Sequence, residues 1–286
     1  MSLTALAPGA DPRAALATAL LSRFLSYSKN VKAATLPPQA VRRLRTSIRR
    51  LVSLIDAAQA VAPRRALAAQ RRRLQAQLRS LGVLRDADIT RSFIVERQKD
   101  NPSLALFAEE LRARRGALAA RAAAGLAAFD QQPLEKTLSY AADHLRGQTQ
   151  ERAAARFTGF LGGTLSGILR ARARSSPDDL GSIHRLRIAF KKLRYAAEAL
   201  NALLADFSRN DLEAMHGFHS LMGQIQDLSV IAAGIERFGG SRNRVVRDEL
   251  RPVVREIREE QRVLIETLDQ AAEQALDYWM KQLAIS

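Results

Sequence analysis

Four residues between positions 184 and 194 combine a histidine with three cations along one side of a predicted helix. His184, Arg187, Lys191 and Arg194 follow one another at steps of three, four and three residues. At about 100° per residue, they fall within a wedge of roughly 80°. Arginine forks and a protonated imidazole can each donate hydrogen bonds to phosphate oxygens. The spacing therefore predicts a stripe of donors suited to a polyanion.

The competing interpretation is a solvated helix face, which explains most isolated pairs of Lys and Arg. A solvated face usually interleaves acidic residues among the basic ones, whereas this stripe contains none. Like charges three or four residues apart on a helix destabilise it by about 0.3 kcal/mol per pair. An anionic ligand would offset that repulsion, so the stripe favours binding over simple solvation.

A similar stripe recurs nearer the N-terminus. Arg45 aligns with Arg187 at an offset of 142 residues (187 − 45), and Gly82 aligns with Gly223 at an offset of 141 (223 − 82). Two landmarks at nearly one offset, close to half the chain length, predict a tandem duplication. The residues of the first stripe are Arg42, Arg45 and Arg49.

Other charged residues on the same two helices are predicted to take different roles. Asp56 and Glu198 lie at equivalent positions at the C-terminal ends of the stripes. They either end the binding surface or orient a neighbouring basic side chain by ion pairing, and we favour the orienting role. The cations predicted to face solvent are Arg43, Arg50, Arg185 and Lys192.

The rest of the chain must supply helices that hold the stripes. Apolar residues recur at three- and four-residue steps almost throughout, and Gly and Pro are sparse, at 15 and 9 of 286 residues. Helix starts are predicted where a capping residue precedes proline. We therefore predict an all-α protein of two tandem halves, 1–146 and 147–286, joined within 131–149 and each containing about four helices. The predicted starts are Asp11-Pro12, Asn101-Pro102 and Ser176-Pro177.

A second pair of matching segments surrounds the two aligned glycines. Gly82 and Gly223 are predicted to permit a tight bend or a close helix contact. Asp86 and Asp227, four residues later in each half, would then cap the following helices. His216 and His219 lie among apolar residues, so we assign both to the interior of a bundle.

Composition limits the classes of partner and chemistry. The chain carries 45 Lys and Arg against 29 Asp and Glu, a formal net charge of +16, which predicts attraction to polyanions. Aromatic residues make up only 5%, which disfavours a surface that stacks successive bases. With no cysteine, thiolate chemistry and Cys-ligated metals are excluded. No basic leader and no long apolar run occurs, so we expect a cytoplasmic protein without a membrane span.

At these residues the sequence resembles the CHAD family, the conserved histidine α-helical domain. The second copy matches the signature helix of that family closely, and the first copy matches it with Arg42 in place of the histidine. The stretch "LGVLRDADI" also resembles the segment after the third helix of the family. The matching residues of the two signature helices are Arg45, Arg49, Arg50 and Leu51, and His184, Arg187, Lys191, Lys192, Leu193, Arg194, Tyr195 and Glu198.

The resemblance implies two four-helix bundles related by pseudo-two-fold symmetry, with a basic groove or channel between them that binds inorganic polyphosphate. Tyr195 would donate its hydroxyl to phosphate or pack against the stripe. His184 would either bind more strongly as the pH falls or stay neutral and hydrogen-bonded within the bundle. The expected polyphosphate-binding residues are Arg42, Arg45, Arg49, Arg50, His184, Arg187, Lys191, Lys192, Arg194 and Tyr195.

Three other interpretations compete with or extend this one. A nucleic-acid-binding protein could use the same basic helices, although the scarcity of aromatic residues counts against it. A phosphate-cleaving enzyme would need metal-binding carboxylates or an activated nucleophile, and neither pattern is found, so we expect no catalysis, no cofactor and no metal. A structural protein of polyphosphate granules or another storage granule is compatible with polyphosphate binding.

Overall fold

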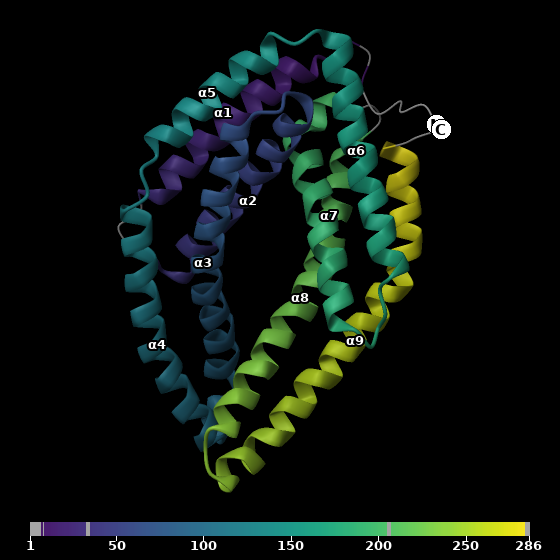
Figure 1. The fold of residues 1–286 in the computed structure, drawn as a ribbon. Helices are drawn as coiled ribbons and strands as arrows, with labels where there is room; N and C mark the ends of the chain where they lie inside the picture. Colours follow the sequence, from purple (N-terminus) through teal and green to yellow (C-terminus); the bar gives the residue numbers. More distant parts are fainter. Residues whose placement is uncertain (1–6, 8, 33–34, 205–206, 284–286) are drawn as a thin grey trace.

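The computed structural model describes residues 7, 9–32, 35–204 and 207–283. Helices form all the regular secondary structure in these residues, which confirms the all-α prediction. Figure 1 shows how they are arranged. The elements are α1 (Pro12–Val31), α2 (Pro38–Val61), α3 (Arg65–Arg97), η1 (Gln98–Asp100), α4 (Pro102–Ala127), α5 (Gln132–Arg146), α6 (Gln150–Ala173), α7 (Leu180–Leu200), η2 (Asn201–Leu203), α8 (Arg209–Gly240) and α9 (Arg244–Leu283).

The helices pack in the same succession in the two parts of the chain. α1 packs on α2, α2 on α3 and α3 on α4, just as α6 packs on α7, α7 on α8 and α8 on α9. This repeated order is consistent with a duplication. The predicted join at 131–149 contains one further helix, α5, which packs against α1 and ends at Arg146. The division at 146 and 147 into two halves stays a prediction.

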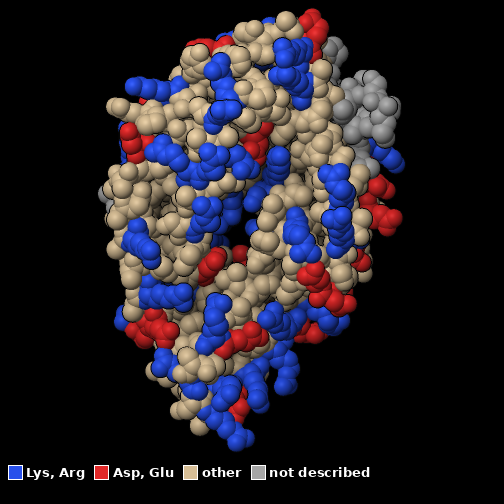
Figure 2. All heavy atoms as spheres, viewed as in Figure 1, with Lys and Arg blue, Asp and Glu red and all other residues tan. Residues whose placement is uncertain are grey.

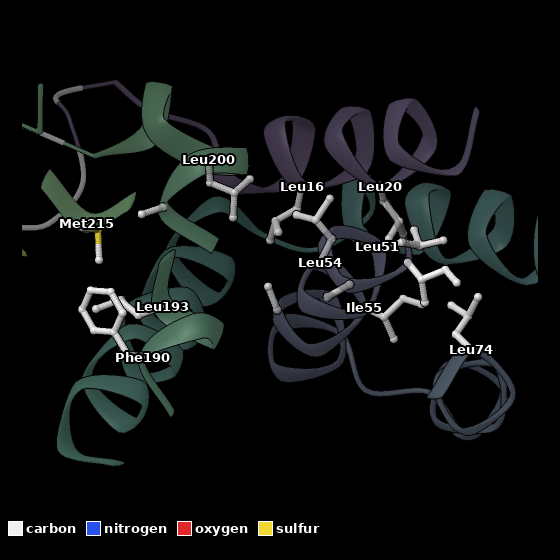
Figure 3. Packing of buried hydrophobic residues seen from close by; sticks show 14 of the residues in the cluster. Leu16, Leu20, Leu51, Leu54, Ile55, Leu74, Phe190, Leu193, Leu200 and Met215 are labelled. Carbon is white, nitrogen blue, oxygen red and sulfur yellow. The ribbon is translucent and has the colours of Figure 1, made fainter. Parts of the chain in front are cut away.

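The two parts share their core. One continuous cluster of buried apolar residues runs from α1 and α2 through α6 and α7 to α8 and α9, and a second lies where α3 and α4 meet α8 and α9. Figure 3 shows side chains of the larger cluster, contributed by several helices. Burying each large apolar side chain contributes about 1.5–3 kcal/mol. Because the larger cluster is continuous, helices of both parts of the chain contribute to one core.

Helix α7 buries the side that the sequence predicts. The apolar residues next to the basic stripe are between 0% and 2% exposed. Phe190 packs edge-to-face against an aromatic ring of α8 and at a tilt against one of α9. Its ring centroid lies 5.0 Å from that of Phe218 and 5.1 Å from that of Trp279. This packing fixes the rotation of α7 about its axis, and thus the direction of its basic stripe. The buried residues are Leu186, Phe190, Leu193, Ala197 and Leu200.

Two of the three predicted helix starts are confirmed. Asp11 accepts a hydrogen bond from the backbone N–H of Arg13, and Asn101 accepts one from Leu104. The start at Ser176-Pro177 is wrong, because α7 begins at Leu180. Asp179 caps it instead by accepting a bond from the N–H of Gly181, and Asp is one of the preferred residue types at this position.

No helix among the described residues combines the length and the apolar character needed to cross a bilayer.

Candidate anion-binding groove

A hollow of about 1120 Å³ lies between α2 and α3 on one side and α7 and α8 on the other. We call it the central groove. Figure 2 shows Lys and Arg side chains gathered around a hollow in this face, with acidic side chains at its edge. Eight arginines and four carboxylates line it. The lining arginines are Arg42, Arg45, Arg49, Arg50, Arg85, Arg187, Arg194 and Arg209.

The contact between α2 and α7 brings the two predicted stripes to one groove. Both helices bury one side in the shared core, so their basic sides turn toward the same space. Eight of the ten predicted site residues line the groove, and Lys191 and Lys192 do not. The predicted residues that line it are Arg42, Arg45, Arg49, Arg50, His184, Arg187, Arg194 and Tyr195.

Lys191 lies close behind the groove wall, among cations of both stripes. Burial first, and then the positive charges of Arg49, Arg187, Arg45 and Arg194, lower the pKa of its ammonium from 10.5 to about 7. A lysine without a carboxylate partner in such a place loses hydration and gains only repulsion. A polyanion in the groove would supply the missing negative charge.

Lys192, which is also among the predicted site residues, does not line the groove. Its Nζ lies 5.2 Å from the centroid of the Phe160 ring on α6, away from the groove. One residue of an α-helix corresponds to about 100° of rotation, so the neighbour of Lys191 points to a different side of α7. That side is covered by α6 and is half-buried rather than open to solvent as predicted.

Arg50 differs from Lys192 in that it does line the groove. The helical pattern predicts that it faces solvent, but it lines the groove and forms an ion pair with Glu198 of α7. Glu198 Oε2 also lies 3.4 Å from Arg194 Nη1. Glu198 thus pairs with one arginine of α2 and one arginine of α7, which agrees with its predicted orienting role. Asp56 pairs with Arg71 of α3 instead.

The predicted bends at Gly82 and Gly223 are wrong. α3 and α8 continue through them without interruption, and both glycines line the groove where an arginine of the neighbouring helix passes close by. The alternative prediction, a close contact with another helix, is the correct one. Arg45 Nη1 donates a hydrogen bond of 2.9 Å to the backbone carbonyl of Leu78 at this contact.

Asp86 and Asp227 do not cap helices either, because they lie in the middle of α3 and α8 and line the groove. Burial raises the pKa of both carboxyls, although neighbouring arginines act to lower it. Asp227 Oδ2 lies 3.9 Å from Arg85 Nη2. The sequence held a signal for this placement, since each aspartate follows its glycine by four residues and so shares its helix face.

The histidines divide between the groove surface and its buried wall. His184 Nδ1 lies 2.6 Å from Gln226 Oε1, within hydrogen-bonding distance. His216 is exposed and lines the groove, so its assignment to the bundle interior is wrong. His219 is buried as predicted. Burial, followed by repulsion from Arg187 and Arg194, lowers the pKa of His219 to about 2 and keeps it neutral.

Several groove arginines are only partly satisfied among the described residues, even where an ion pair or hydrogen bond engages one of their nitrogens. Burial, with repulsion from Arg49, lowers the pKa of Arg45 to about 10, so Arg45 stays charged at neutral pH. The Nε atoms of Arg50, Arg187 and Arg194 are buried and have no hydrogen-bond partner within the described structure. Each unsatisfied buried donor costs about 1–3 kcal/mol.

Tyr195 is buried, and the Arg194 guanidinium lies 4.2 Å from the centroid of its ring.

The described residues contain no group of three or more His, Cys, Asp or Glu side chains placed to hold a metal ion.

Comparison with known proteins assigns the chain to a family. A sequence model of the CHAD domain matches residues 15–236. The chain belongs to the CHAD domain family. Every residue that lines the central groove of this CHAD protein lies within the matched segment. No curated protein matches the chain in sequence.

Two solved structures share the fold. The crystal structure of the CHAD domain from the plant Ricinus communis superposes with a TM-score of 0.73 at 23% identity, covering 96% of this chain and 95% of that one. PptA from Streptomyces chartreusis superposes with a TM-score of 0.64 at 17% identity, covering 94% of this chain and 100% of that one. At these identities the likeness extends to the fold alone, and it includes the α9 region outside the matched segment.

Proposed function

We propose that the central groove binds inorganic polyphosphate and holds it without cleaving it. The observation that carries the proposal is the convergence of eight arginines, from the helices of both parts of the chain, on one groove that has only four carboxylates. Polyphosphate is a flexible chain with about one negative charge per phosphate. It can therefore meet successive guanidinium groups along α2 and α7, each of which forms strong charge-assisted hydrogen bonds.

The lining of the groove favours polyphosphate over nucleic acid. Tyr195 is the sole Phe, Tyr or Trp side chain among the lining residues, and Arg194 already covers its ring. Proteins that hold single-stranded nucleic acid usually stack bases on several aromatic rings. A chain of phosphates needs no such surface, so an arginine-lined groove with a single covered ring suits it better.

The carboxylates of the groove support holding rather than cleavage. Asp86 and Asp227 both lie among arginines, and Arg85 comes within 3.9 Å of Asp227. A carboxylate surrounded by cations is a poor ligand for a divalent metal, because the cations repel the metal. Phosphoryl transfer usually depends on such a metal or on an activated nucleophile. We further propose that the bound polymer recruits the protein to cytoplasmic polyphosphate granules.

The proposal is tested by calorimetric titration of the purified protein with long-chain polyphosphate at about physiological salt, with duplex and single-stranded DNA as competitors. We expect binding that DNA does not displace and that weakens with added salt, because every neutralised phosphate releases counterions. Equal or tighter binding of DNA would replace this function with general phosphate binding. Release of phosphate on addition of Mg²⁺ or Mn²⁺ would show an enzyme instead.

A further inference from the structure

Two glycines in the central groove occupy positions where glycine is unfavourable for the helix. Gly82 lies inside the 33-residue helix α3, and Gly223 lies inside the 32-residue helix α8. Glycine in a helix interior is less favourable than alanine, since it loses more conformational freedom on folding. Neither helix is interrupted there, so a break in the helix does not explain these residues. What the two sites share is an arginine of the neighbouring helix that passes over the glycine.

The contact at Gly82 is too close for a Cβ atom unless the Arg45 guanidinium shifts by a few tenths of an ångström. A Cβ atom at this position would lie 3.3 Å from Arg45 Nη1, closer than ordinary van der Waals contact. The same Nη1 donates a 2.9 Å hydrogen bond to the carbonyl of Leu78, one turn before Gly82. A helical side chain lies over the turn that precedes it, so a side chain at position 82 would crowd the guanidinium that bonds to that carbonyl.

We propose that Gly82 is a positioning residue of the groove, which uncovers the Leu78 carbonyl so that Arg45 is anchored there and its guanidinium faces the ligand. The inference rests on the proposed polyphosphate binding. Because Arg45 has one N–H engaged by Leu78, the direction of its remaining donors is set before the ligand arrives. Arg45 lies near the middle of the first stripe, between Arg42 and Arg49, where a displaced guanidinium would interrupt the row of donors.

The second part of the chain has the same arrangement with more room. A Cβ atom at Gly223 would lie 3.7 Å from Arg187 Nη2 and 3.9 Å from Arg187 Nε, which is ordinary contact. That Nε has no hydrogen-bond partner among the described residues. Alanine at position 223 should therefore disturb its arginine less than alanine at position 82.

The test compares the affinity of Gly82→Ala and Gly223→Ala for long-chain polyphosphate with that of wild type. Gly163→Ala on α6 is the matched control, since a Cβ there would meet nothing within 4 Å and Gly163 lies outside the groove. We expect Gly82→Ala to weaken binding by roughly threefold to tenfold, Gly223→Ala by less, and Gly163→Ala not at all. In an Arg45→Gln background, Gly82→Ala should have no further effect. Wild-type affinity in Gly82→Ala, or an equal loss in both backgrounds, would overturn the proposal.

A second readout needs no polyphosphate and so separates failure of this inference from failure of the proposed function. Alanine normally stabilises a helix relative to glycine, so Gly82→Ala should raise Tm by roughly 1 to 3 °C in the Arg45→Gln background. With Arg45 present the gain should be smaller, because the new methyl group disturbs its bond to Leu78. Equal gains in both backgrounds would contradict the positioning role, even in a protein that binds no polyphosphate.

Discussion

Replacing Lys191 by methionine should stabilise the ligand-free protein, although it removes a residue of the signature helix. Lys191 lies among Arg45, Arg49, Arg187 and Arg194, and its pKa is lowered to about 7. Methionine has a similar length and no charge, so Lys191→Met keeps the packing while it removes the repulsion and the desolvation of an ammonium group.

The size and the pH dependence of the gain follow from that pKa. The fall from 10.5 to about 7 corresponds to at most about 5 kcal/mol at about 1.4 kcal/mol per pKa unit, and water in the groove will reduce it to a few kcal/mol. The unfolded chain binds more protons than the folded protein between pH 7 and 10.5. The stability of wild type therefore rises with pH across this range, whereas that of Lys191→Met lacks this rise.

Urea unfolding at pH 6.5, 8 and 10, without polyanion, measures the effect. Lys191→Met should be more stable than wild type by a few kcal/mol (~2–4) at pH 6.5, and the difference should shrink toward pH 10. Lys192→Met is the matched control, because Lys192 lies over Phe160 outside the groove and should give no pH-dependent gain. Destabilisation by Lys191→Met at pH 6.5, or a gain that is the same at every pH, would refute this reasoning.

Two further predictions concern the groove carboxylates and the core. Asp86→Asn with Asp227→Asn should tighten polyphosphate binding, measured by calorimetry, because two negative charges leave the groove. Because the pKa of both carboxyls is raised, wild type loses the same charges as the pH falls. The gain in affinity of the double variant should therefore be smaller in acid than at pH 8. Weaker binding by the variant than by wild type at pH 8 would contradict this prediction. Phe190→Ala should cost about 3–5 kcal/mol in urea unfolding, because it empties the contact with Phe218 and Trp279; a loss under ~1 kcal/mol would contradict the packing.

Hydrophobic periodicity is sufficient to predict the apolar side that α7 buries. The apolar arc of α7, from Leu186 to Leu200, and the neighbouring stripe from His184 to Arg194 both follow from a turn of about 100° per residue. The internal repeat is equally informative, since its offset of 142 residues pairs Arg45 with Arg187, and both line the groove.

The residues that the sequence pattern misplaces lie on helix sides whose neighbour the pattern does not specify. A helical pattern gives the angle of Arg50 or Lys192 relative to the core, but it does not say that α7 covers one side of α2 or that α6 covers one side of α7. Asp86 and His216 are misplaced for a related reason. The pattern predicts that Asp86 begins a new helix and that His216 lies inside a bundle. Instead α3 and α8 are continuous, and one side of each lines the groove.

The most direct test of the account compares polyphosphate binding by two charge-reversed variants. Arg45→Glu with Arg187→Glu reverses one groove cation in each stripe, and Arg43→Glu with Arg170→Glu makes the same change in net charge at exposed positions outside the groove. With both variants folded by circular dichroism, we expect the groove variant to lose at least about 100-fold in affinity and the outer variant to stay within about threefold of wild type. Equal losses in the two variants would mean that total charge attracts the polymer, and that the groove is not its site.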